Sequence, residues 1–185
     1  MCTKHFQRWE KYGTWKSLKD LFIEDNPPQN GIGQIPLSRG KVAIVDERRY
    51  LALIHLNWHI TNSGYAARWE NGNLILMHRD IHGTPESMNT DHINRNKLDN
   101  RDANLRSCTQ AENMRNVSRH SDSTAPYKGI SLMQGSSKWK AKINVDGSSQ
   151  HLGTFQTPED AAVAYDKAAV RHYGKFACIN FTRAA

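Results

Sequence analysis

The sequence predicts an α+β protein made of small separate parts, because strand-like and helix-like patterns come in groups and do not alternate regularly. Residues 127–155 contain three short strand-like runs, and residues 157–174 then show the spacing of a single helix. Upstream, residues 41–79 combine short apolar runs with one helical segment. A polar stretch, residues 91–116, lies between these groups, and the 185 residues suffice for one domain or for two or three small ones.

The composition points to a polyanionic partner inside a cell. The net charge of +7 and the pI of about 9.4 favour nucleic acid, although many basic proteins are merely soluble. The cysteines (Cys2, Cys108 and Cys178) form no CxxC pair, which argues against a structural zinc site and a disulfide framework. No apolar run is long enough for a membrane helix, and the N-terminus lacks the features of a signal peptide. We therefore expect a cytoplasmic protein, in a bacterium or a phage-infected host, with no membrane partner.

The first half of the chain divides into an extension and a small folded unit. Residues 1–34 are predicted to be an extension with a short helix at 14–22, capped by Thr14, before residues 26–33 break any regular structure. Residues 35–87 are predicted to form a small α+β unit. Its elements are a strand at 41–46, a helix at 46–56 with Asp46 as cap, two strands within 57–68, and a strand at 73–79.

The second half contains a hairpin with a helix, a linker and a sheet with a helix. Residues 88–117 are predicted as a strand at 88–93, a polar loop at 94–103, a strand at 104–108, and a helix capped by Thr109 and Glu112. Residues 118–126 have the composition of a linker. Residues 127–185 are predicted to place strands at 127–133, 138–145 and 150–155 against a helix at 157–174, with Thr157 as N-cap and Gly174 as stop.

The polar stretch carries the groups that hydrolysis of a phosphodiester needs. His92 has the intrinsic pKa of a general base, and Asp91 is a hard oxygen ligand for Mg²⁺ or Mn²⁺. Asn113 can supply a second, neutral oxygen if its helix packs back across the hairpin. The alternative is that these residues are ordinary turn residues and a structural histidine. One difficulty is that neighbouring residues on a regular strand point to opposite faces.

The pattern DH-(11)-N-(8)-N within DHINRNKLDNRDANLRSCTQAEN resembles the HNH nucleases, the ββα-metal finger class, and is most similar to homing endonucleases of phage and bacterial introns. MHR at 77–79 also resembles their sequence. The resemblance implies that Asp91 and Asn113 hold one divalent metal, that His92 is the general base, and that Asn104 orients His92. It also implies that metal and base reach the phosphate from different sides, which addresses the strand difficulty. His78 and His82 are weaker candidates for contacts at this site. Arg106 either clamps a phosphate there or is a structural surface arginine.

The C-terminal strands suggest a DNA-binding sheet. In KWKAKIN, Lys138, Lys140, Lys142 and Asn144 share one face of a strand, and apolar residues share the other. A solvated lysine face is ordinary in antiparallel sheets. However, residues 127–181 resemble the Apetala-two/ethylene-response-factor DNA-binding domain, through YKGI, KWKAKI, LGTF and FACINF.

This second resemblance implies that the three-stranded sheet reads the DNA major groove. It implies DNA contacts by Lys128, Ser131, Met133, Lys138, Lys140, Lys142, Asn144 and His151. Plant members carry several arginines and tryptophans on these strands, whereas this chain has Ser131, Met133 and His151, so we expect a different target sequence. The side chains expected to form the core are Trp139, Leu152, Phe155, Tyr165, Phe176 and Phe181.

Together the patterns predict a site-specific DNA endonuclease of the homing type, from a mobile intron or a phage relative, that uses Mg²⁺ or Mn²⁺. One finger has one base and one metal, so we expect a monomer that nicks one strand of double-stranded DNA. One alternative is a non-catalytic DNA-binding transcriptional regulator that keeps the finger as a scaffold. Another is a protein that binds or cuts RNA, which the sheet argues against because the RNA major groove is narrow. Four further cations either grip DNA or are ordinary surface charges: Arg39, Lys41, Arg48 and Arg49.

Overall fold

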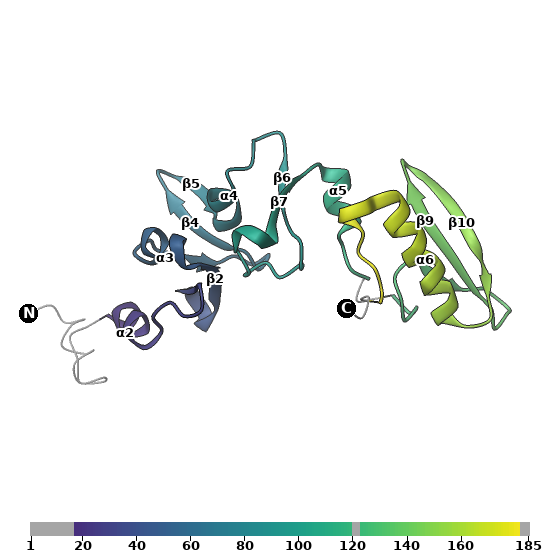
Figure 1. The fold of residues 1–185 in the computed structure, drawn as a ribbon, viewed down its shortest axis with the longest axis horizontal. Coiled ribbons are helices and arrows are strands. Elements are labelled where there is room, and N and C mark those ends of the chain that lie inside the picture. The colour runs from purple at the N-terminus through teal and green to yellow at the C-terminus, as the bar shows by residue number, and fades with distance from the viewer. Residues whose placement is uncertain (1–16, 120–122, 182–185) are drawn as a thin grey trace, which may run out of the picture. The chain divides into compact units, whose positions relative to one another are not determined.

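The computed structural model describes residues 17–119 and 123–181, and the chain divides into two compact units (Figure 1). The first unit contains the chain up to residue 84 together with residues 96–106, and the second contains residues 85–95 and everything from residue 107. Antiparallel sheets of two or three strands and short helices build both units, which confirms the α+β class. In the described part of the chain, no helix has the length and apolar character needed to cross a bilayer.

The first unit is built on a β-hairpin that packs against a helix. Strands β1 (Ile32–Pro36) and β2 (Val42–Asp46) pair antiparallel around a 3₁₀ turn, η1 (Ser38–Gly40), and α3 (Glu47–Ile54) follows directly. Gly33 is required in β1, because a Cβ there would lie 2.6 Å from Cδ2 of Tyr50 on α3. The buried core of this unit includes Ile35, Leu37, Ala43, Val45, Tyr50, Leu53, Ile54, Trp58, Ala66, Met77, Ile81 and Leu105.

Two expectations near the N-terminus were wrong in their bounds. The helix here is α2 (Leu18–Asp25), whose N-cap is Ser17 with a capping box to Asp20, while the expected cap Thr14 lies outside the described residues. The predicted break at residues 26–33 overlaps β1, which already begins at Ile32. The glycine and prolines suggested a loop, but pairing with β2 and packing on Tyr50 stabilise a strand there.

A three-stranded meander and a short helix complete the first unit. The strands are β3 (His59–Ile60), β4 (Ala66–Glu70) and β5 (Asn73–Leu76), in that order across the sheet. The predicted strand at 73–79 was too long, because the chain turns into α4 (Met77–His82) after Leu76. Met77, His78 and Ile81 are buried on α4 with helical spacing, and the predicted strand ended at residue 79, too early to include Ile81.

The polar loop of residues 96–106 is anchored in the first unit by a charged network. Asp46 is the N-cap of α3 as predicted, but its side chain does not cap the helix; its Oδ2 accepts a hydrogen bond from the main-chain N–H of Asp102 at 2.7 Å. The Asp102 carboxylate in turn accepts hydrogen bonds from Arg48 at 2.6 Å and Arg49 at 2.9 Å. These hydrogen bonds fix η2 (Asp102–Asn104), the turn that carries Asn104.

We expect Asp102→Asn to destabilise the first unit in a pH-dependent way. The Arg49 hydrogen bond is the main cause that lowers the pKa of Asp102 from 3.8 to about 2. Because the folded-state pKa is depressed, the stabilisation is complete above the unfolded-state pKa and is lost as the pH falls through about 2. At pH 7 the variant should lose roughly 1 kcal/mol of unfolding free energy, since the pair is partly exposed. Urea unfolding at pH 7, 4 and 3 checks this; a difference from wild type that does not narrow at low pH would contradict it.

The predicted strand–loop–strand–helix of residues 88–117, here called the finger, is present. Its strands β6 (Asn89–His92) and β7 (Leu105–Cys108) form a two-stranded sheet, and α5 (Gln110–Arg115) follows. The capping box is confirmed: Thr109 Oγ1 accepts from Glu112 N, and the Glu112 carboxylate accepts from Thr109 N at 2.8 Å. This capping box fixes the residue at which α5 begins. It thereby also sets which side of the helix Asn113 and Asn116 occupy.

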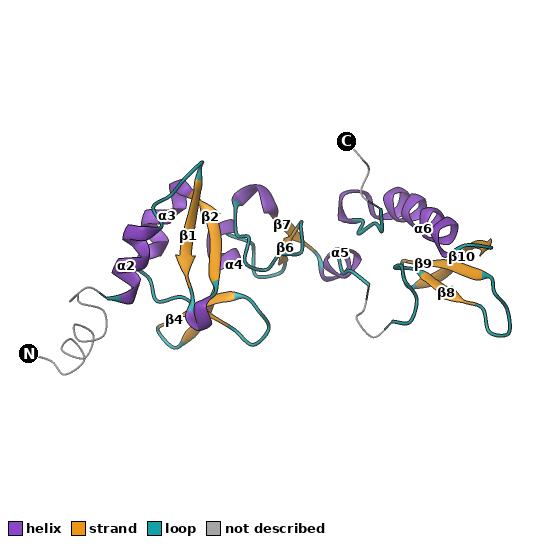
Figure 2. Cartoon of the chain, turned by 90° about the horizontal axis from the view of Figure 1, so that it is seen from below, coloured by secondary structure: helices purple, strands orange, loops and turns teal. Residues whose placement is uncertain are grey.

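The C-terminal module, residues 127–181, has the predicted sheet with one helix on it (Figure 2). Strands β8 (Ile130–Leu132), β9 (Trp139–Val145) and β10 (Ser148–Phe155) form an antiparallel sheet with β9 in the centre, and α6 (Pro158–Tyr173) and η3 (Gly174–Phe176) follow. Thr157 caps α6 as predicted, and the alanines Ala161 and Ala169 are fully buried. The expected core residue Phe181 is instead 37% exposed, with its ring 5.0 Å from that of Tyr127.

Candidate functional site

Asp91 and His92 lie at the end of β6, and both are buried. Their relative exposures are 6% and 4%. A buried carboxylate beside a buried imidazole is costly unless both are hydrogen-bonded, so their burial reflects a specific environment. Arg95, the third residue after His92, has a positive φ of 64° and its N–H donates to His92 O at 2.8 Å, which ends the strand in a tight turn.

Asn116, the residue after α5, holds the Asp91–His92 pair. Its Nδ2 donates to both carboxylate oxygens of Asp91, at 2.9 and 3.0 Å, and to the main-chain oxygen of His92 at 2.9 Å. Asn116 is 4% exposed. The C-terminal end of α5 therefore packs back onto β6, as expected for the helix of a finger. Our sequence interpretation missed Asn116, although its spacing of one helical turn from Asn113 was available as a signal.

Asn113 and Asn104 lie at two different points of the site. Asn113, the fourth residue of α5, is half-buried on the same helical side as Asn116, and its main-chain oxygen accepts from Asn116 N at 3.1 Å. Asn104, 8% exposed in η2, donates from Nδ2 to the main-chain oxygen of Asp99 at 2.7 Å. Its amide is thus held in a fixed orientation by the loop. The proposed roles of both residues, metal ligation and orientation of His92, stay predictions.

The oxygen atoms around the Asn116 amide are the Asp91 carboxylate and the main-chain oxygens of His92 and Ile93. A carboxylate is a hard oxygen ligand of the kind that divalent cations prefer. Each carboxylate oxygen has two lone pairs, so a hydrogen bond from Asn116 still leaves acceptor capacity for an ion. Among the described residues there is no cluster of three or more His, Cys, Asp or Glu side chains. A site with one carboxylate suits Mg²⁺ or Mn²⁺ bound jointly by protein, water and a substrate phosphate.

The two upstream histidines lie on α4 of the first unit, and their expected contact with the site stays a prediction. His78 on α4 is 5% exposed, and its ring lies 4.9 Å from that of Tyr65. His82 is half-buried at the end of the same helix. Arg48 and Arg49, considered above as DNA contacts, are both paired with Asp102. Arg106 is half-buried on β7.

The exposed face of the C-terminal sheet gathers most of the side chains expected to meet DNA. Lys140 lies opposite Ser131 of β8, and Lys142 lies opposite His151 of β10. Lys140, Lys142 and Asn144 alternate with buried Ala141 and Ile143 along β9, as the sequence predicts. The remaining expected contacts on this side, Lys138 and Met133, are exposed in the turn between β8 and β9.

Lys128, the first of the expected DNA contacts, has a different environment. It is half-buried, and its Nζ donates to the main-chain oxygen of Arg115 at 2.9 Å and to that of Val117. Burial lowers the pKa of Lys128 below its ordinary value. In this structure its ammonium group is thus engaged by the end of α5.

Comparison with known proteins identifies the family. The family model described as HNH endonuclease matches residues 75–115, which contain Asp91, His92, Asn104 and Asn113. An uncharacterized HNH endonuclease, L560, of Acanthamoeba polyphaga mimivirus is 30% identical over 175 residues, which cover 90% of this chain and 88% of that protein. The chain belongs to the HNH endonuclease family. The matched segment contains most of the finger, and the similarity to the viral protein extends over nearly the whole chain.

Plant transcription factors match only part of this HNH family member. The ethylene-responsive transcription factor WRI1 of Arabidopsis thaliana is 38% identical over 69 residues, or 36% of this chain and 16% of that protein. The ethylene-responsive transcription factor ERF024 of the same plant is 42% identical over 57 residues, or 30% of this chain and 31% of that protein. The HNH chain thus spans less than a third of these relatives' length. The similarity therefore concerns a segment of each protein.

Proposed function

We propose that the chain is a site-specific, divalent-metal-dependent DNA endonuclease of the homing type that nicks one strand of a duplex. The observation that carries the proposal is the buried Asp91–His92 pair held by Asn116 at the junction of β6 and α5, inside the family segment. The basic face of the C-terminal sheet supports duplex DNA as the substrate, because such a surface fits the wide major groove of B-form DNA.

His92 is assigned the role of general base. It accepts a proton from the water molecule that attacks the scissile phosphorus, and the bond from phosphorus to the leaving oxygen then breaks. Asp91 and Asn113 are assigned to a divalent ion, which when bound stabilises the negative charge that develops on the phosphate and the leaving oxygen. Asn104, fixed to Asp99 O at 2.7 Å, is assigned to orienting the imidazole of His92. Each of these roles is part of the proposal.

The C-terminal module is assigned to recognition of the target. Lys140 and Lys142 lie at alternate positions on its central strand, next to Ser131 and His151 on the flanking strands. The lysines suit phosphates, which supply affinity, and the shorter polar side chains suit base edges, which supply specificity. One chain carries one such site, so we propose a monomer on DNA and a single nick per binding event.

Supercoiled plasmid carrying a randomised insert library tests the proposal. The purified full chain is incubated with it in Mg²⁺, in Mn²⁺ and in EDTA, and products are separated on agarose. We expect metal-dependent open circles whose nicks map to one sequence class, and intact plasmid with EDTA. Linear product would overturn the single nick in favour of paired cuts. Tight binding with intact plasmid in both metals would overturn catalysis and support the non-catalytic regulator, and preferential competition by RNA duplex would overturn DNA as substrate.

A further inference from the structure

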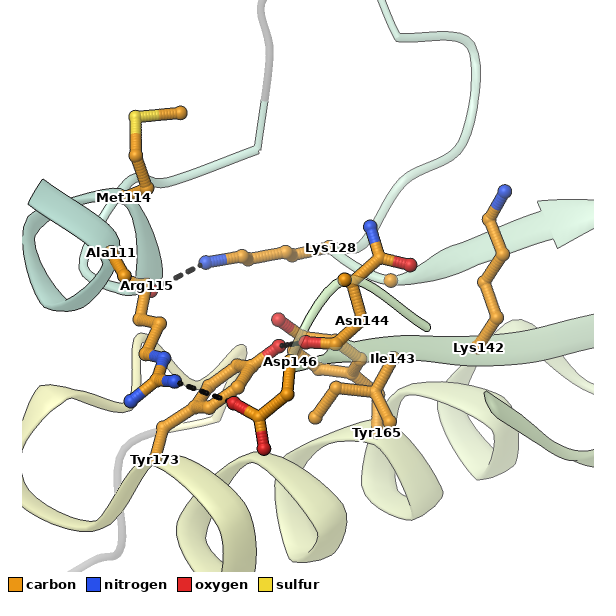
Figure 3. A pocket seen from close by; sticks show the side chains of 12 residues that line it. Ala111, Met114, Arg115, Lys128, Lys142, Ile143, Asn144, Asp146, Tyr165 and Tyr173 are labelled. Atoms are coloured by element: carbon orange, nitrogen blue, oxygen red, sulfur yellow. Dashed lines mark hydrogen bonds and ion pairs between the residues drawn. The ribbon is translucent and has the colours of Figure 1, made fainter. Parts of the chain in front are cut away.

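The C-terminal module contacts the finger at the C-terminal end of α5, and Lys128 makes the central contact. Its Nζ donates to the main-chain oxygen of Arg115 (Figure 3). It also donates to the main-chain oxygen of Val117. The last carbonyl groups of a helix have no partner within the helix, and a cation near them also interacts favourably with the helix dipole. Lys128, 13 residues after Arg115 in the sequence, therefore caps the C-terminal end of α5.

The other contacts around this pocket are weaker. The pocket, about 440 Å³, lies between α5 and the module, and Arg115 reaches across it to Asp146 at 3.5 Å and stacks 5.1 Å from the ring of Tyr173 (Figure 3). Asp146 is 84% exposed, so water screens this ion pair and it contributes little. By contrast, Lys128 is half-buried, and hydrogen bonds that involve a charged group are stronger than those between neutral groups. Lys128 is therefore the strongest of these contacts from the module to the end of α5.

The two carbonyl groups bound by Lys128 flank Asn116. The main-chain oxygens of Arg115 and Val117 lie immediately before and after the residue whose amide contacts Asp91. Fixing the peptide groups on both sides of a residue fixes its backbone orientation, and with it the direction of its side chain. Asn116 is also buried, which restricts the other positions its side chain can adopt. A continuous set of hydrogen bonds therefore runs from Lys128 through the backbone at Asn116 to Asp91.

We propose that Lys128 is a positioning residue for the cleavage site, acting through Asn116 on Asp91 and His92. The inference rests on the proposed nuclease function and deepens it, because it makes the DNA-binding module part of the structure of the active site. The module then does more than increase the local concentration of DNA. Active-site groups must hold their geometry within a fraction of an ångström, so losing the cap slows the chemical step more than it weakens binding.

The kinetic test compares Lys128→Met with Lys167→Met in the full chain. Methionine keeps the length of the side chain and removes its donors, and Lys167 is an exposed lysine on α6 that serves as matched control. We expect the single-turnover cleavage rate at saturating protein to fall at least about tenfold in Lys128→Met, with the dissociation constant for duplex DNA within about threefold of wild type. Lys167→Met should match wild type in both. Lys128→Arg keeps donors for both carbonyl groups and should recover most of the rate.

NMR spectroscopy of the protein without DNA or metal tests whether Lys128 fixes the position of Asn116. The side-chain amide signals of Asn116, assigned in ¹⁵N-labelled protein by their loss in Asn116→Asp, should be dispersed and protected from solvent exchange in wild type. They should move toward free-amide positions in Lys128→Met and stay unchanged in Lys167→Met. Unchanged Asn116 signals in Lys128→Met overturn the inference even if cleavage slows, because Lys128 would then act on DNA directly. No cleavage by the wild-type chain overturns the proposed function instead, and the amide signals still decide the contact.

Discussion

Replacing His92 by alanine should lower the DNA cleavage rate by at least about 100-fold, while duplex binding changes by no more than about twofold. Loss of a general base typically removes a factor of 10²–10⁴ from the rate, because the attacking water keeps its proton. His92 is 4% exposed in the finger, far in sequence from the sheet residues assigned to DNA, so affinity should be spared. Single-turnover cleavage of the plasmid and equilibrium binding to a short duplex measure the two quantities.

Controls must separate lost chemistry from lost folding, since His92 is buried. His92→Gln keeps hydrogen-bonding capacity and most of the volume but cannot act as a base near neutral pH, so it should be as inactive as His92→Ala. Added imidazole should restore part of the activity of His92→Ala, whose cavity leaves room for it, and less of His92→Gln. Cleavage by both variants at rates near wild type would contradict the assignment of the base.

Gly129→Ala should unfold the C-terminal module or destabilise it by at least about 3 kcal/mol. Gly129 has φ of +79°, and a Cβ there would lie 1.9 Å from Cδ2 and 2.2 Å from Cε2 of Tyr165. Tyr165 is 3% exposed and packs with Ile143 and Ala169, so its ring has no space to move aside. Gly129 O also accepts from Lys142 N at 2.9 Å, so the displaced backbone would lose this hydrogen bond to β9. The expected result is a lower unfolding midpoint and loss of duplex binding.

Gly135→Ala is the matched control for this prediction. Gly135 has a similar φ of +71°, and a Cβ there would meet nothing within 4 Å. It therefore measures the cost of alanine in the left-handed region alone, which is about 1–2 kcal/mol. Urea unfolding followed by the near-ultraviolet signal of the module compares the two variants. Equal losses in Gly129→Ala and Gly135→Ala would show that the Tyr165 ring gives way, and would contradict the predicted clash.

Features set by local sequence were predictable here. The helix starts at Thr109 and Thr157 depend on a side chain three residues away, and the alternation of Lys140, Ala141 and Lys142 depends on a strand period of two. Such signals need no knowledge of the rest of the fold. They gave the starts of α5 and α6 and the solvent-facing side of the sheet, and the strand pattern placed Asp91 and His92 in β6.

Features set by distant contacts were not predictable from one sequence. Ile32 and Gly33 form a strand because β2 and Tyr50 lie against them, although their neighbours favour a turn. Asp46 turns its carboxylate to Asp102, 56 residues away, and so does not cap its own helix. Lys128 follows a pattern that suggests a DNA contact, but the end of α5 takes its ammonium group. Asn116 had one local signal, its spacing of one helical turn from Asn113, but its contact with Asp91 depends on how α5 packs on β6.

The loop of the finger depends on the first unit for its hydrogen bonds, which limits how the coding sequence can be divided by recombination. Ile44 of β2 exchanges two main-chain hydrogen bonds of 2.7 Å with this loop, donating to Leu98 O and accepting from Asn100 N, and Asp102 is held by Arg48 and Arg49. Residues 96–106 accordingly belong to the first compact unit and lie inside the segment 75–115 that the family model matches. The matched segment is therefore not an independent folding unit. Moving this segment into another protein without the β1–β2 hairpin and α3 would remove the hydrogen-bond partners of its loop. A functional transfer should therefore include residues of the first unit as well.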